Sequence, residues 1–134
     1  MTTIAFDGIC LGDGPITGVA RSFLNALSAY ARRGDVQCVL LLPRDAHCEP
    51  IEGVRLVEAP RGALRRQRQL PDLLRSMAAS LMHSSVASVP RRAPCPTIAT
   101  AHDLPWLHQE LDEPGNALRQ LAVRRSLRSA ARIL

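Results

Sequence analysis

The chain has no lysine and few aromatic residues, although it is rich in charge and in aliphatic side chains. All 17 basic residues are arginines, and aromatic residues make up only 3% of the 134 positions. Proteins that bind single-stranded nucleic acids commonly stack bases on aromatic side chains. The scarcity of aromatics therefore argues against a nucleic-acid partner, and aliphatic side chains must fill the core.

Cysteine is sparse too, and its spacing argues against two kinds of small protein. Cys10, Cys38, Cys48 and Cys95 form no Cys-x-x-Cys pair and have no partner histidine at metal-ligand spacing. A disulfide framework or a zinc site is therefore not expected. Cys38 lies inside an apolar run, where cysteine behaves as a small hydrophobic residue.

Long apolar runs are missing as well. The N-terminus lacks the basic segment and apolar stretch of a secretory signal, and no apolar run is long enough to span a bilayer. We therefore expect a cytoplasmic protein that at most rests on the inner face of a membrane. The length suits a single domain over residues 1–134.

The arginines are spread along the chain, and they are densest in one stretch of the sequence. The net charge is +5, and such a surface attracts phosphates and anionic lipid headgroups. Two interpretations of the densest stretch stay open: the solvated face of a helix, or a peripheral contact with a membrane surface or an acidic substrate. This stretch contains Arg61, Arg65, Arg66, Arg68 and Arg75.

Short strand patterns alternate with helical ones along the chain. Strands are predicted at 3–6, 36–42, 54–59 and 81–84, and a further one starts at 97 and ends in His102-Asp103. Helices are predicted after Thr17, which serves as N-cap, to Arg33, from near Pro71, and after Asn116. This alternation predicts an α/β fold with a Rossmann-like, doubly wound parallel sheet that has helices on both faces.

The last residues read as the end of a helix followed by the start of a strand. We therefore expect the domain to be truncated at its C-terminal end.

The most polar strand ends are expected to meet at one crevice. In an open parallel sheet, ligands bind beyond the carboxyl ends of the strands, where the strand order reverses. Gly14 and Gly18 follow the first strand, Ser84 ends the fourth, and His102 and Asp103 end the fifth. Glycines allow close backbone approach, and the following helix N-terminus can receive an anion. His102 can then bond a substrate hydroxyl or phosphate, with Asp103 orienting it, or it can make a purely structural hydrogen bond.

The glycine loop differs from the compact dinucleotide-binding fingerprint. Its spacing is Gly-x-Gly-x-x-x-Gly, and Pro43-Arg44 rather than an acidic residue ends the second strand. An Arg44 that binds a 2′-phosphate would permit an NADP-binding oxidoreductase domain as an alternative. A non-catalytic module that binds a partner is a third possibility.

Four segments together resemble one family. Residues 13–21 (DGPITGVAR), 81–85 (LMHSS), 97–106 (TIATAHDLPW) and 128–134 (RSAARIL) are similar, in order and spacing, to the N-terminal domain of family 4 glycosyltransferases of the GT-B fold, the glycogen-synthase-like enzymes. The resemblance covers nearly the whole chain.

The resemblance implies a transferase that moves a sugar, with retention, from a nucleotide-diphosphate donor to an acceptor, without a metal or other cofactor. It places Gly14 and Gly18 near the donor diphosphate and His102 at the donor sugar, with Arg21 adding positive charge. Thr17, Ser84 and Asp103 join the expected donor and acceptor site. Family enzymes hold the nucleotide mainly in a second, C-terminal domain, so these 134 residues alone are expected to be inactive.

Overall fold

The computed structural model describes residues 1–12, 15–102 and 117–134. Within these ranges the chain forms three helices and one six-stranded sheet, in the order β3-β2-β1-β4-β5-β6. Every neighbouring pair of strands is parallel. The predicted α/β class with a parallel sheet is confirmed, and the strand order is consistent with a Rossmann-like doubly wound domain.

One half of the sheet is built from β1 (Thr2–Asp7), β2 (Val36–Pro43) and β3 (Val54–Ala59), with β3 at the edge. In β2, four consecutive side chains from Cys38 to Leu41 are fully buried. Both faces of this strand are covered, which explains an apolar run without polar alternation. The expected hydrophobic role of Cys38 is confirmed.

Helix α1 (Gly18–Arg33) begins and ends where the sequence predicts. The Thr17 side chain accepts a hydrogen bond from the amide of Ala20 at 3.2 Å, which satisfies one of the free amides of the first turn. Gly34 ends the helix at φ 70°, a left-handed conformation that glycine adopts without steric cost. Phe23 and Leu27 pack against the sheet.

Helix α2 (Ala63–Ser76) corrects the prediction of a basic loop followed by a helix starting near Pro71. The helix runs continuously through Pro71. Proline lacks the amide that would bond the carbonyl four residues earlier, but here its ring is buried with Leu70 and Leu74 in the core. This burial offsets the missing hydrogen bond and keeps the helix intact.

The other half of the sheet contains β4 (Leu81–Ser84), β5 (Thr97–Ala99) and β6 (Arg132–Ile133). The prediction that β5 ends in His102-Asp103 is wrong, because pairing with the short β4 stops at Ala99 opposite Ser84. His102 therefore lies three residues beyond the strand. Helix α3 (Ala117–Ser129) precedes β6, and the predicted cap Asn116 lies outside the described residues.

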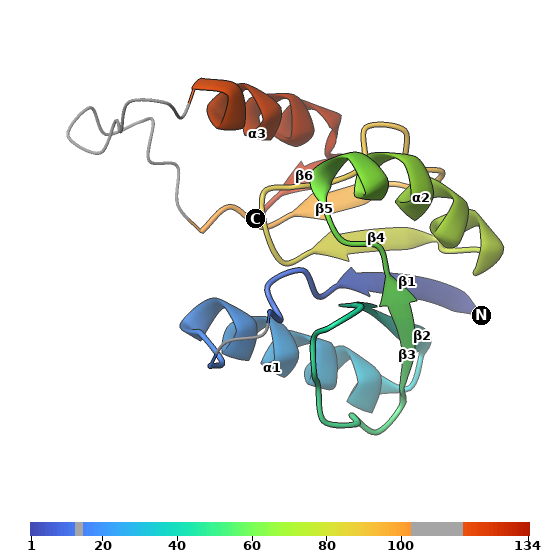
Figure 1. Ribbon diagram of the computed structural model, residues 1–134. Coiled ribbons are helices and arrows are strands. Elements are labelled where there is room, and N and C mark those ends of the chain that lie inside the picture. Colours follow the sequence, from blue (N-terminus) through green and yellow to red (C-terminus); the bar gives the residue numbers. More distant parts are fainter. Residues whose placement is uncertain (13–14, 103–116) are drawn as a thin grey trace.

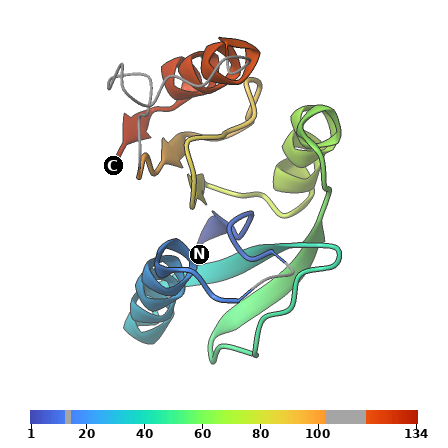
Figure 2. The same ribbon diagram turned by 60° about the vertical axis from the view of Figure 1, so that its left-hand side comes forward.

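The helices lie on both sides of the sheet. Helix α1 covers one face, and α2 and α3 lie on the other (Figure 1, and from a second direction Figure 2). Because all the strands are parallel, their carboxyl ends share one edge, and the loops that begin there are the candidates for function. In the described part of the chain, no helix combines the length and apolarity that a membrane crossing requires.

Candidate functional site

The strand order changes direction at β1, which lies between β2 and β4. The chain leaves β1 through α1 on one side of the sheet, whereas α2 leads into β4 on the other (Figure 1). A crevice is expected at such a switch point, outside the carboxyl ends of the two strands. The strands that precede the three predicted polar loops, β1, β4 and β5, are neighbours at this edge, as the sequence indicates.

Ser85 joins these three loops. Its amide donates to the carbonyl of Asp7 at 3.3 Å, and its Oγ accepts from the amide of Cys10 at 3.3 Å. Its carbonyl oxygen lies 3.0 Å from Nε2 of His102. The residue is almost completely buried. Through these contacts it holds both the loop after β1 and His102 against the start of the loop between β4 and β5.

His102 is exposed, although one of its ring nitrogens makes a hydrogen bond within the protein. A carbonyl oxygen can only accept a hydrogen bond, so Nε2 is the donor to Ser85. In the neutral ring, Nδ1 is then an acceptor that can meet a hydroxyl group. The hydrogen bond to Ser85 orients the ring, and the exposure leaves the opposite side open to a ligand.

His83 has a different environment. Its ring packs against Phe6 and Phe23 with centroids 5.8 and 6.3 Å away, and Nε2 lies 3.0 Å from Oγ1 of Thr100. Burial lowers the pKa of His83 below its ordinary value, because the charged imidazolium is less well solvated there. This histidine is a packing element of the α1 side of the sheet, joined by one polar contact to the segment after β5.

The glycine loop can be described only in part, since Gly14 lies outside the described residues, as does Asp103. Gly18 is the first residue of α1, and a methyl group added there would meet no atom within 4 Å. Glycine is therefore not required by the packing of the chain itself. Thr17 is occupied as the helix cap, and Arg21 lies exposed on the first turns of α1.

Ser84 is fully buried. Its Oγ donates to the carbonyl of Ser88 at 2.8 Å and accepts from the amide of Val86 at 3.4 Å. Its side chain therefore organises the turn after β4. The structure thus brings Ser84 and His102 to the same edge through Ser85, with different degrees of access.

A buried ion pair lies directly beneath this edge. Arg66 of α2 bonds the carboxylate of Asp7 at the end of β1 and donates to the carbonyl of Pro60 at 3.1 Å. Only 7% of Arg66 and none of Asp7 is exposed. Burial raises the pKa of Asp7, which the guanidinium of Arg66 opposes only in part. Within the described residues, one carboxylate oxygen, Oδ1, has no hydrogen-bond partner.

The sequence did not reveal this pair. Arg66 belongs to the basic stretch whose possible roles were a solvated helix face or a membrane or acidic-substrate patch, and for Arg66 both are wrong. Arg61 bonds Asp45 and Arg75 bonds Asp72, so the stretch is not one uniform positive surface. The signal that was available was the position of Asp7 at the end of a buried strand, where an acidic side chain needs a partner.

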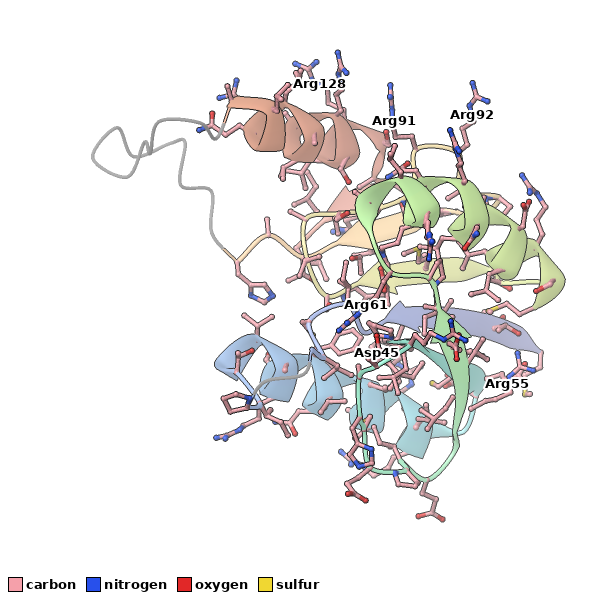
Figure 3. The ribbon with its side chains drawn as sticks, in the orientation of Figure 1. Asp45, Arg55, Arg61, Arg91, Arg92 and Arg128 are labelled. Atoms are coloured by element: carbon pink, nitrogen blue, oxygen red, sulfur yellow. The ribbon has the colours of Figure 1, made fainter. Side chains whose placement is uncertain are left out.

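A pocket of about 610 Å³ opens at the same edge on the α1 side, between the loop after β1, α1 and the loop after β2. Apolar side chains form most of its wall, including Leu11, Leu24 and Ile51. Figure 3 shows Asp45 and Arg61 near this end of the molecule, whereas Arg91, Arg92 and Arg128 extend from the α2 and α3 side. This pocket could not be predicted from the sequence, because its walls come from three separate segments.

Arg44, the residue that would read a 2′-phosphate in an NADP site, follows β2 directly. Its Nε lies 3.5 Å from a carboxylate oxygen of Glu58 on β3, and both side chains are exposed.

In the described part of the chain, no group of three potential ligand residues could hold a metal ion. No family model, curated protein or solved structure matches the chain.

Proposed function

We propose that this chain is the acceptor-side domain of a retaining glycosyltransferase that uses a nucleotide-diphosphate sugar. The observation that carries the proposal is the set of hydrogen bonds at Ser85, which joins the loop leading to α1 to His102 at the switch point of the sheet. The resemblance of four segments in order to family 4 glycosyltransferases supports it. A nucleotide sugar needs both elements, an anion site for the diphosphate and polar groups for the sugar.

The N-terminus of α1 supplies the anion site in this proposal. The first intrahelical hydrogen bond runs from the amide of Arg21 to the carbonyl of Thr17, so the amides of Gly18 and Val19 precede it. Such amides, together with the helix dipole, favour a phosphate group. The open space at Gly18 permits close approach, and Arg21 adds a positive charge nearby.

In this proposal His102 contacts the donor sugar. With Nε2 donating to Ser85, Nδ1 accepts a hydrogen bond from a donor-sugar hydroxyl and fixes the sugar relative to the acceptor. Orientation of this kind accelerates a transfer because the reacting atoms are already aligned. The residues that carry the nucleotide belong, by the resemblance, to a second domain, so this domain binds the donor weakly by itself.

The test is a titration of the ¹⁵N-labelled chain with UDP-glucose and, separately, GDP-mannose, followed by amide chemical shifts. We expect shifts at millimolar concentrations that concentrate at Gly18, Ser85 and His102. The variant Gly18→Ala should weaken them several-fold, because its methyl group occupies the phosphate approach. Ser22→Ala, on an exposed position of the same helix, should leave them unchanged. Shifts that avoid these residues, or none with either donor, would refute the proposal.

An NADP-binding domain is the second candidate, favoured only by the position of Arg44 after β2. A fluorescence titration with NADPH separates the two. Micromolar binding that Arg44→Ala abolishes would support the oxidoreductase domain, and binding no tighter than that of UDP-glucose would support the glycosyltransferase domain. Failure of both nucleotides to bind at the sheet edge would favour a non-catalytic module that binds a partner.

A further inference from the structure

The pocket beside α1 is shaped by where small residues fall on the helix. Ala20, Leu24 and Ser28 are four residues apart and line it as one stripe. The small side chains of Ala20 and Ser28 leave space on both sides of Leu24. The loop after β2 covers this space but does not fill it. The volume of about 610 Å³ lies within the range of roughly 300–1,000 Å³ that is typical of small-molecule sites.

The hydroxyl and thiol groups that line this pocket either already have a hydrogen-bond partner or carry no charge. The hydroxyl of Ser28 donates to the carbonyl of Leu24 at 2.8 Å. Burial raises the pKa of the Cys10 and Cys48 thiols, so both stay uncharged at neutral pH. The interior therefore favours an apolar group.

The charges at the pocket belong to one sign. Asp45 and Glu49 line it, and His47 lies between them with Nε2 3.5 Å from Glu49. Although arginine is abundant in the chain, none of the described residues that line this pocket is an arginine. Asp45 is paired with Arg61 at 3.1 Å, so the carboxylate that acts on a ligand in the pocket is that of Glu49. An anionic ligand would be repelled by this carboxylate, whereas a neutral or cationic polar group would not.

The pocket also adjoins the proposed donor site through a single residue. Cys10 contributes to the pocket wall, and its amide bonds Oγ of Ser85, the residue that also holds His102. A molecule in the pocket thus lies beside the loop that positions His102. The aromatic side chains Phe6, Phe23 and Tyr30 cluster elsewhere, around His83, so no aromatic plate for stacking a sugar ring was found among the lining residues.

From these observations we infer that the pocket binds a small molecule with an apolar body and a neutral or cationic polar end, and that it discriminates against anions. Its assignment as the acceptor rests on the proposed function: the acceptor would then be an amphipathic small molecule rather than a free sugar. The apolar body lies between Leu11, Leu24 and Ile51, and the polar end faces Glu49.

Three probes with one ring system test this inference: 2-naphthylmethylamine, 2-naphthol and 2-naphthoate. Amide shifts of the labelled 134-residue chain should show the amine and the naphthol at Leu11, Leu24 and Ile51, with naphthoate at least tenfold weaker. Ser28→Phe should fill the pocket and reduce binding of the amine at least tenfold. Ser22→Phe places the same side chain on an exposed position of the same helix and should bind like the parent chain.

The variant Glu49→Gln tests the charge argument separately and leaves the Arg61–Asp45 pair intact; it should bring the affinities for the amine and naphthoate close together. Equal binding of the amine and naphthoate to the parent chain would overturn the inference, as would unchanged binding to a folded Ser28→Phe variant. Probe binding in the pocket without any UDP-glucose or GDP-mannose shift at His102 would support the site and refute the acceptor role. Nucleotide-sugar shifts without probe binding would support the proposed function and refute the inference about the pocket.

Discussion

At the scale of single residues, the site depends on side chains that face inward as much as on those a ligand can reach. Ser85 is buried but holds His102 and the loop after β1. Asp7 and Arg66 are buried beneath the same edge. A buried ion pair is costly to desolvate, and it becomes much more costly when one partner is removed. The carboxyl end of β1 is therefore held by an ion pair, and replacing only one of its two members is expected to destabilise the fold.

The variant Arg66→Leu tests this dependence. Without the guanidinium, burial is opposed only by the weaker effect of the Ile9 backbone hydrogen bond, so the pKa of Asp7 rises further above the ordinary value. A carboxyl whose pKa is raised in the folded state contributes stability when protonated, and that contribution is lost as the pH rises above the unfolded value of about 3.9. We expect Arg66→Leu to cost about 3–5 kcal/mol at pH 7 and distinctly less at pH 5.

Urea unfolding followed by circular dichroism at both pH values measures these costs. The matched control is Arg65→Leu, because Arg65 is the exposed neighbour of Arg66, and it should change stability little at either pH. A similar pH dependence in the two variants would show that Asp7 does not depend on Arg66.

At the scale of elements, α1 contributes to both proposed sites, the phosphate site at its N-terminus and the pocket along its side. Its start is fixed by the Thr17 cap. Thr17→Ala removes the acceptor of the Ala20 amide and should cost about 1 kcal/mol of stability. Urea unfolding checks this value, and Ser22→Ala, on the exposed side of the helix, should cost nothing measurable. A fully stable Thr17→Ala variant would mean that the cap does not set the start of α1.

The elements also show where reading the sequence succeeds. Helix α1 and strands β2 and β3 were predictable because periodicity, capping residues and terminating prolines are local signals. Helix α2 was not, since Pro71 is compatible with a helix only when the core covers it. The end of β5 was missed because it is set by the length of its neighbour β4.

The candidate site divides in the same way. The positions of the loops after β1, β4 and β5 followed from the parallel order of the strands. The contacts within the site did not, because Asp7 and Arg66 are 59 residues apart in sequence and Cys10 and Ser85 are 75 apart. Periodicity carries no information about partners at such distances. The edge of the sheet at which these loops meet can thus be predicted, whereas the side chains that hold the loops together have to be seen in the structure.

At the scale of the whole molecule, a single parallel sheet offers one wall to a ligand. In the proposed function, the N-terminus of α1 is the anion site on that wall and His102 faces the sugar, while the resemblance assigns most of the nucleotide contacts to another domain. Catalysis requires interactions that strengthen in the transition state, and one wall leaves the leaving diphosphate largely in water. We therefore expect the 134-residue chain to release no UDP from UDP-glucose above the rate in buffer, with or without 2-naphthol as acceptor.

A coupled assay for UDP measures this release, and His102→Ala distinguishes the chain from a contaminant. UDP release that His102→Ala abolishes would show that one wall is sufficient for chemistry and that the second domain is not needed for the reaction itself. Release that is equal in the two proteins would belong to an impurity. A half-site predicts no UDP release together with nucleotide-sugar shifts at Gly18 and His102. Binding needs only contacts with the ligand, whereas turnover requires the protein to enclose the transition state.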